Sequence, residues 1–144
     1  SSASRERFEG YRDMLKEGGA PLEPRFVRGA QLSMQSGYDN AAALLSDDRK
    51  PRAIFCGNDL IAYGAFRRCN ELGLKVPDDV ALFGFDDNPL NEWIAPWLST
   101  IHVPYAEIGA AVSEEMQRLW QMKTSPKRVA TRLLPYQIKL RSST

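Results

Sequence analysis

Two short apolar runs lie in the middle of the chain, and a cluster of polar residues follows each of them. The first run covers residues 53–56 and precedes the polar cluster 57–59, and the second covers 80–85 and precedes 86–88. Continuous apolar runs are typical of strands that helices cover on both faces, as in a parallel sheet. Because ligands bind at the carboxyl edge of such a sheet, we expect both polar clusters to lie at a ligand site.

Periodicity predicts the remaining elements on either side of these two runs. Helical spacing predicts helices over residues 5–17, 36–45 and 105–122, and a further helix between residue 59 and Gly73. Apolar or alternating runs predict strands over residues 25–29, 98–103, 129–134 and 136–140. Strands that alternate with helices predict an α/β fold, with a parallel sheet flanked by helices.

Composition narrows the class of protein only slightly. A length of 144 residues favours one domain, or one lobe of a larger protein. The net charge of +1 gives no reason to expect nucleic acid or an anionic membrane as a direct partner. Cys56 and Cys69 lack the spacing of a zinc site, which favours two reduced thiols in a cytosolic protein. No signal peptide or membrane span is recognisable, and the Ser-rich start without Met indicates a chain cut from a longer one.

Arg7, Asn58 and Asp59 each have a functional and a structural interpretation. Asn58 and Asp59 follow a strand end and precede a helix, so they can contact a ligand, cap the helix, or do both. Arg7 lies near the start of the first predicted helix, where it can reach a ligand at the sheet edge. Arg7 can equally belong to a solvated helix face, as most charged residues do.

Asp86 and Asp87 form a pair of carboxylates at the end of the second apolar run. Such a pair can bind a metal ion, act as acid and base, or simply form a turn with the following Asn88 and Pro89. The pair has no neighbouring Lys or His that would support a catalytic role. His102, the one histidine, has no evident partner. Gly84 within the run predicts a close approach by another backbone or a ligand.

Several motifs follow one another along the chain: RERFEGY (5–11), SGY (36–38), AIFCGND (53–59), GLKVPDDV (73–80), GFDD (84–87) and PWLSTI (96–101), with RSST (141–144) at the end. In order and spacing they resemble the C-terminal part of the effector-binding domain of LacI/GalR-family transcriptional repressors. The resemblance covers essentially all 144 residues. It implies a periplasmic-binding-protein-like (type I) fold made of two lobes.

The resemblance also implies how the chain is organised. Residues 1–101 correspond to the C-terminal effector-binding lobe without its first strand, and residues 102–144 to a crossover helix and return strands. The helix-turn-helix domain and most of the N-terminal lobe are absent from the chain. A regulator of this kind implies a cytoplasmic, non-enzymatic homodimer without cofactor or metal. The expected partners are a small effector, which is a sugar or nucleobase-like molecule, and operator DNA. The DNA is reached only through the absent domain, and no membrane is expected as a partner.

Residue by residue, the resemblance assigns ligand contacts to Arg7, Asn58, Asp59 and Asp86. It assigns a dimer contact to the helix after Asp59 and the segment after Asp87, where the apolar residues are Tyr63, Phe66, Trp93 and Ile94. Leu32 stands where many members have an aromatic residue that stacks on the ligand. Val103 stands where some sugar-binding members have glutamine, so the identity of the ligand stays open.

Two other functions fit parts of the pattern. A periplasmic sugar-binding protein of a transport system has the same fold. A Mg²⁺-dependent phosphoryl-transfer enzyme could use Asp59, Asp86 and Asp87, although the chain has no P-loop.

Overall fold

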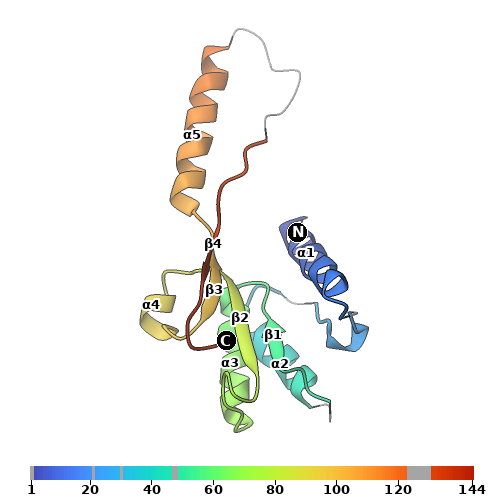
Figure 1. Cartoon of the computed structure of the whole chain (residues 1–144). Coiled ribbons are helices and arrows are strands. Elements are labelled where there is room, and N and C mark those ends of the chain that lie inside the picture. The colour runs from blue at the N-terminus through green and yellow to red at the C-terminus, as the bar shows by residue number, and fades with distance from the viewer. Residues whose placement is uncertain (1, 21, 30, 47–48, 123–130) are drawn as a thin grey trace.

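The protein is described by a computed structural model, which covers residues 2–20, 22–29, 31–46, 49–122 and 131–144. Its centre is a four-stranded sheet with the order β1-β2-β3-β4 (Figure 1). The first three strands are parallel and β4 is antiparallel to β3. The strands are β1 Ala53–Phe55, β2 Ala81–Asp86, β3 Ser99–His102 and β4 Gln137–Lys139. The predicted α/β fold with a mainly parallel sheet is confirmed.

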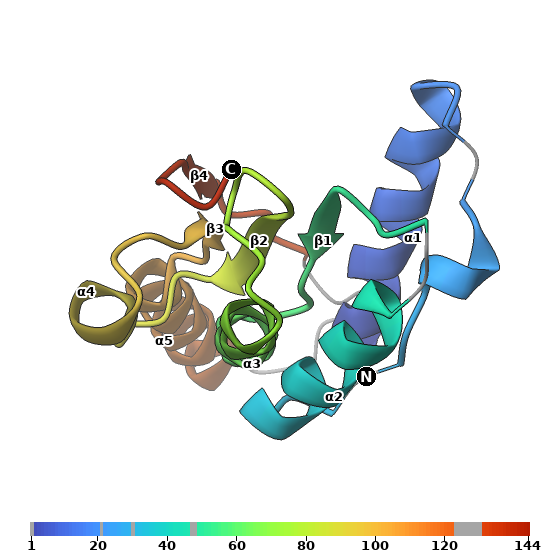
Figure 2. The ribbon, with the colours of Figure 1, turned by 90° about the horizontal axis from the view of Figure 1, so that it is seen from below.

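Helices precede, connect and follow these strands. They are α1 Ser2–Glu17, α2 Met34–Leu45, α3 Asp59–Glu71, α4 Asn91–Ile94 and α5 Tyr105–Gln121. Helices α2 and α3 lie side by side against the sheet (Figure 2). A Cβ at Gly64 would come 1.9 Å from the backbone oxygen of Met34, and a Cβ at Gly37 would come 2.1 Å from that of Ile61. Only residues without a side chain allow the two helices to approach this closely.

The core lies between this helix pair and the sheet. Its fully buried side chains include Leu82, Leu98 and Val80, which fits the apolar runs read as strands. Cys56 and Cys69 are free and buried in the same core. Burial raises the pKa of the Cys56 thiol to about 12 and that of Cys69 to about 11. Both thiols are therefore protonated and chemically inert at neutral pH.

Helix α5 extends away from the sheet, and the chain then returns to form β4 (Figure 1). No residue of α5 is buried. The C-terminal residues after β4 lie beside β2 and β3, where Leu82 N donates to Ser143 O at 2.9 Å and Ser143 N donates to Trp97 O at 2.9 Å. The end of the chain is therefore an integral part of the sheet's hydrogen bonding.

Two predicted strands differ from the structure. Residues 25–29 form no strand: Pro24–Phe26 is a 3-10 turn, and the residues after it have no hydrogen-bonded strand beside them. A strand is stable only next to a partner, and a cavity separates this segment from β1. In the predicted strand over 129–134, residues 129–130 lie outside the described part, and residues 131–134 are not in a strand. The last predicted strand is confirmed as β4.

A candidate ligand site at the carboxyl edge of the sheet

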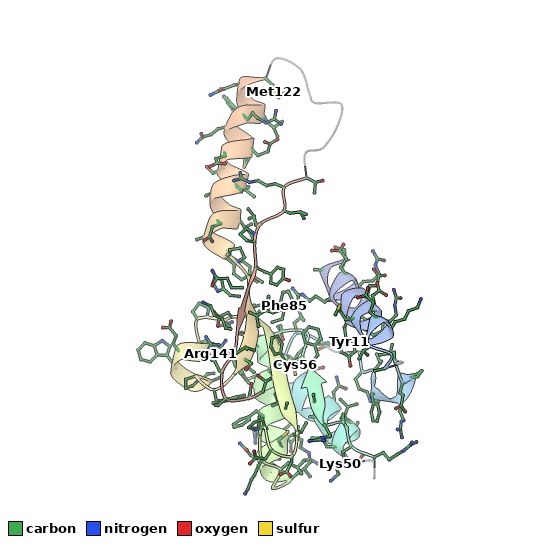
Figure 3. All side chains as sticks on the ribbon, in the orientation of Figure 1. Tyr11, Lys50, Cys56, Phe85, Met122 and Arg141 are labelled. Atoms are coloured by element: carbon green, nitrogen blue, oxygen red, sulfur yellow. The ribbon has the colours of Figure 1, made fainter. Side chains whose placement is uncertain are left out.

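Arg7 reaches from α1 to the ends of both apolar strands. Its Nη1 donates to Gly57 O at 2.7 Å, just after β1, and its guanidinium carbon lies 3.9 Å from the centre of the Phe85 ring in β2. Its Nη2 lies 3.7 Å from Asp86 Oδ1. Figure 3 shows Phe85 at the end of the sheet from which α5 departs. Three distant segments thus place a guanidinium beside a carboxylate, at the edge of the sheet where the sequence predicted ligand contacts for Arg7 and Asp86.

Asp86 is held in an unusual backbone conformation at the end of β2. Its φ is 108° and that of Asp87 is 53°, and residues other than glycine rarely adopt such positive φ values. Tyr105, the first residue of α5, donates its hydroxyl to Asp86 Oδ1 at 3.1 Å. Oδ2 has no hydrogen bond within the described residues, so it can accept one from a ligand. Burial raises the pKa of the Asp86 carboxyl above its ordinary value, despite the nearby Tyr105 and Arg7.

Asn58 is the N-cap of α3. Its Oδ1 accepts a hydrogen bond from Ile61 N at 3.0 Å, which satisfies one free amide of the first turn. Its Nδ2 makes no hydrogen bond to any residue that the structure describes. The capping interpretation is therefore confirmed, and the remaining amide hydrogens are the part of Asn58 that can donate to a ligand.

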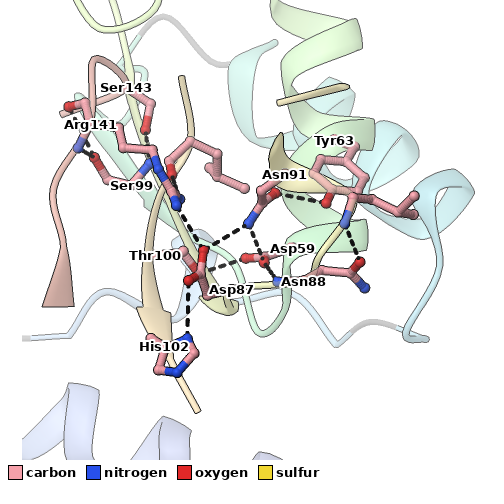
Figure 4. Close-up of polar contacts among 12 residues, drawn as sticks. Asp59, Tyr63, Asp87, Asn88, Asn91, Ser99, Thr100, His102, Arg141 and Ser143 are labelled. Atoms are coloured by element: carbon pink, nitrogen blue, oxygen red, sulfur yellow. Dashed lines mark hydrogen bonds and ion pairs between the residues drawn. The ribbon is translucent and has the colours of Figure 1, made fainter. Parts of the chain in front are cut away.

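Asp59 lies beneath the site and points inward, which corrects the predicted ligand contact. It is 1% exposed. Its Oδ1 accepts from Thr100 Oγ1 at 2.7 Å, and its Oδ2 accepts from Asn88 N at 2.7 Å and from Asn91 Nδ2 at 2.8 Å (Figure 4). A Cβ at Gly84 would come 2.2 Å from Asp59 Oδ1. A close approach does occur at Gly84, but this buried carboxylate makes it, and not the backbone or ligand that the sequence predicted.

Asp87, although next to Asp86 in the chain, turns toward the opposite side. Arg141 Nη2 donates to its Oδ1 at 2.9 Å, and His102 Nδ1 lies 3.1 Å from its Oδ2 (Figure 4). Burial acts to raise the pKa of Asp87, but the hydrogen bonds from Arg141, Asn91 and His102 hold it below its ordinary value. Arg141 is 54 residues away in sequence, and no local pattern could have indicated this partner.

An apolar cavity of about 410 Å³ adjoins the site below Arg7. Helix α1 lies on one side of it, and residues 26–29, helix α2 and the free edge of β1 form the other sides. On the α1 side, Tyr11 stacks on Phe55 of β1 with ring centres 5.8 Å apart. Figure 3 shows Tyr11 between α1 and the sheet, near Cys56. Leu32, which is 57% exposed, also lines this cavity.

The four predicted dimer residues divide into two pairs. Trp93 and Ile94 of α4 are 82% and 54% exposed. Tyr63 is buried, and its hydroxyl donates to Asn91 Oδ1 at 2.7 Å. Phe66 stacks on Trp97 within the chain, with ring centres 3.8 Å apart. Tyr63 therefore belongs to the core rather than to a surface, and the exposed apolar patch on this side is formed by α4.

The carboxylates do not gather as a metal site would require. Within the described ranges, no group of three or more His, Cys, Asp or Glu side chains could hold a metal ion. Asp59 already accepts three hydrogen bonds from protein donors. Among the helices described, each one is too short or too polar to cross a membrane.

The whole chain matches one known protein family. A family model described as a periplasmic binding protein-like domain matches residues 1–144. The chain belongs to this family. The mainly parallel sheet flanked by helices is what a member of the family should have, so sequence and structure agree on the fold.

Bacterial transcriptional regulators are similar to this chain. The ribose operon repressor of Haemophilus influenzae is 34% identical over 119 residues, which cover 82% of this chain and 36% of that protein. The HTH-type transcriptional regulator DegA of Bacillus subtilis is 34% identical over 146 residues, which cover 100% of this chain and 42% of that protein. The predicted resemblance to LacI-type regulators is thus confirmed, and the chain spans about two-fifths of the length of these relatives.

A solved structure gives the same result. That of a LacI family transcriptional regulator from Enterococcus faecium, with bound ribose, has a TM-score of 0.85 and 30% sequence identity. The match covers 98% of this chain and 51% of that chain.

Proposed function

We propose that this chain is the effector-binding and dimerisation portion of a LacI/GalR-type transcriptional repressor that senses a sugar or a related metabolite. The observation that carries the proposal is the pairing of Arg7 with Asp86 at the carboxyl edge of the sheet. A guanidinium supplies directional donors and a carboxylate supplies acceptors. Together they suit a ligand that presents hydroxyl groups or ring N–H groups side by side.

Polar groups available around this pair extend the same chemistry. Asp86 Oδ2 can accept from a ligand hydroxyl, and Asn58 Nδ2 can donate to a ligand oxygen. A relative named for the ribose operon and a neighbour with bound ribose support a sugar as the class of ligand. The site holds no nucleophile with an adjacent base among the described residues, which favours binding over catalysis. A repressor of bacterial transcription acts in the cytoplasm.

The proposal assigns residues 1–101 to the C-terminal lobe and residues 102–144 to the crossover helix and return segment. It places a helix-turn-helix domain and most of the N-terminal lobe outside this chain. The free edge of β1 and the apolar cavity beside it support the assignment of a first strand that is not part of this chain. The exposed apolar residues along α5, among them Val112, Met116 and Trp120, support contacts with the other lobe.

Isothermal titration calorimetry on the intact regulator tests the ligand site, with D-ribose as the first probe and sucrose and adenine as further probes. Asp86→Ala and Arg7→Ala should each weaken binding of the responding probe about tenfold to a hundredfold, because each removes a charge-assisted hydrogen bond. Asp13→Ala is the matched control, since Asp13 lies on the exposed side of α1 and pairs with Arg12 alone among the described residues. Unchanged affinity in Asp86→Ala, with a native circular dichroism spectrum, would show that the site is assigned wrongly.

A further inference from the structure

Tyr105 occupies a position that the sequence motifs did not single out. It follows Pro104 at the start of α5, where the chain leaves the sheet, and its backbone N donates to Val103 O at 2.8 Å. Its side-chain hydroxyl donates to Asp86 Oδ1 at 3.1 Å. The residue is nevertheless 60% exposed. A tyrosine with its hydroxyl held in place and its surface open to solvent presents a fixed ring to whatever binds at Asp86.

Two other apolar side chains near the site, Phe85 and Leu32, do not offer such a ring. Phe85 has one face covered by the guanidinium of Arg7, at 3.9 Å from the ring centre. Leu32 lines the apolar cavity and carries no ring. Ring-shaped ligands are bound by a few placed polar groups together with an apolar or aromatic surface. Tyr105 combines both properties, because its ring is apolar and its hydroxyl is already bonded to the acceptor of the site.

The hydroxyl also affects which atom of Asp86 meets the ligand. Tyr105 and Arg7 both approach Oδ1, whereas Oδ2 has no partner within the described residues. With Oδ1 occupied, the carboxylate keeps one orientation, and Oδ2 is the atom left to accept a hydrogen bond. Fixing an acceptor before the ligand arrives lowers the entropic cost of binding.

We propose that Tyr105 is a specificity-determining residue of the effector site: its ring supports one face of a cyclic ligand and its hydroxyl orients Asp86. This inference rests on the proposed function, because it names a further residue of the same site. The ligand class it implies is a cyclic sugar or a similarly flat polar ring. An open-chain polyol has the same hydroxyl groups but no flat face, so it gains less from the Tyr105 ring.

The test uses the intact regulator with two probes, D-ribose and its open-chain counterpart ribitol, measured by calorimetry. In the wild type, ribose should bind more tightly than ribitol. Tyr105→Leu removes both the hydroxyl and the ring, so it should weaken ribitol binding about three- to tenfold and ribose binding about tenfold more than that, and the preference for the ring is lost. Tyr105→Phe keeps the ring but releases Asp86, so it should weaken both probes by a similar factor of about three to ten.

The matched control is Tyr38→Phe. The Tyr38 hydroxyl also donates to a carboxylate, that of Glu71, but it does so where α2 and α3 meet. This variant should bind both probes as the wild type does. A loss of preference caused only by damage to the fold would appear in thermal unfolding, whereas a change in the ribose-to-ribitol ratio reports on the site itself.

The outcomes separate this inference from the proposed function. If Asp86→Ala abolishes ribose binding but Tyr105→Leu keeps the wild-type ratio, Tyr105 is not a specificity residue and the site assignment stands. If Asp86→Ala and Tyr105→Leu both bind ribose as the wild type does, the proposed site itself is wrong. If the wild type binds neither ribose nor ribitol, the inference is overturned for the sugar class on which it was built.

Discussion

The two margins of the sheet are held together in different ways. The polar margin, formed by β3, β4 and the C-terminal residues, is dense in hydrogen bonds: Ser143 Oγ donates to Leu82 O and accepts from Ser99 N, and Arg141 donates to Leu98 O. The apolar margin, formed by α1, β1 and residues 25–29, rests on aromatic contacts around a cavity. We therefore expect the polar margin to be rigid and the apolar margin to change its conformation more easily.

Asp86 and Asp87 show what this difference means for function. Asp87 faces the polar margin, where Arg141 and other partners satisfy it, and its pKa is lowered. Asp86 faces α1 and α5 with one oxygen that has no partner among the residues described, and burial raises its pKa. A carboxylate that is fully satisfied stabilises the fold, whereas one that is partly desolvated and incompletely paired is available for a ligand. Neighbours in sequence thus take opposite roles because they face different margins.

The largest effect on stability is expected for Asp59→Ala, which removes the buried acceptor beneath both strand ends. Thr100, Asn91 and the backbone N of Asn88 would each lose a hydrogen-bond partner in the interior. Because unsatisfied buried donors are costly, the free energy of unfolding should fall by roughly 3 kcal/mol or more. Urea denaturation followed by circular dichroism measures the change. Asp39→Ala on the exposed side of α2 is the control, and equal stability of the two variants would contradict the role given to Asp59.

A smaller loss is expected for Arg141→Ala on the polar margin, roughly 1–3 kcal/mol at pH 7. The variant loses the bonds to Leu98 O and to Asp87. Since the pKa of Asp87 is lowered in the folded protein, its stabilising effect is present above the pKa of an unfolded Asp, about 3.9, and is lost as the pH falls through the folded value. The difference between wild type and variant should therefore narrow in acid. A difference that stays constant down to pH 2 would show that Asp87 plays no part in it.

The smallest effect on folding is expected for Ile94→Asp, because the Ile94 side chain is exposed. Ile94 belongs to α4, which lies beside the sheet (Figure 1). If Trp93 and Ile94 form a two-fold contact, a buried charge at each copy should convert a dimer to a monomer without changing the unfolding free energy of the subunit. Light scattering of the intact protein measures this. Met14→Asp, on the exposed side of α1, is the control. A monomeric wild type at high concentration would exclude the contact.

Local sequence was sufficient for much of the fold. The apolar runs at 53–56 and 80–85 became β1 and β2, and Asn58 became the cap of α3. These features depend on the periodicity and chemistry of neighbouring residues, which a sequence displays directly. The same reasoning placed Asp86 at the carboxyl edge, because strand ends meet there in any parallel sheet. Arg7 reaches this edge from α1, and the local sequence left its role open.

Tertiary structure alone decided the direction of each side chain at that edge. Asp59 turned into the interior because Thr100, Asn91 and Asn88, all more than 25 residues away, supply its donors. The positive φ of Asp86 and Asp87 sends adjacent carboxylates to opposite margins, a choice that no turn pattern encodes. Residues 25–29 stayed out of the sheet because a strand requires a partner that its own sequence cannot provide.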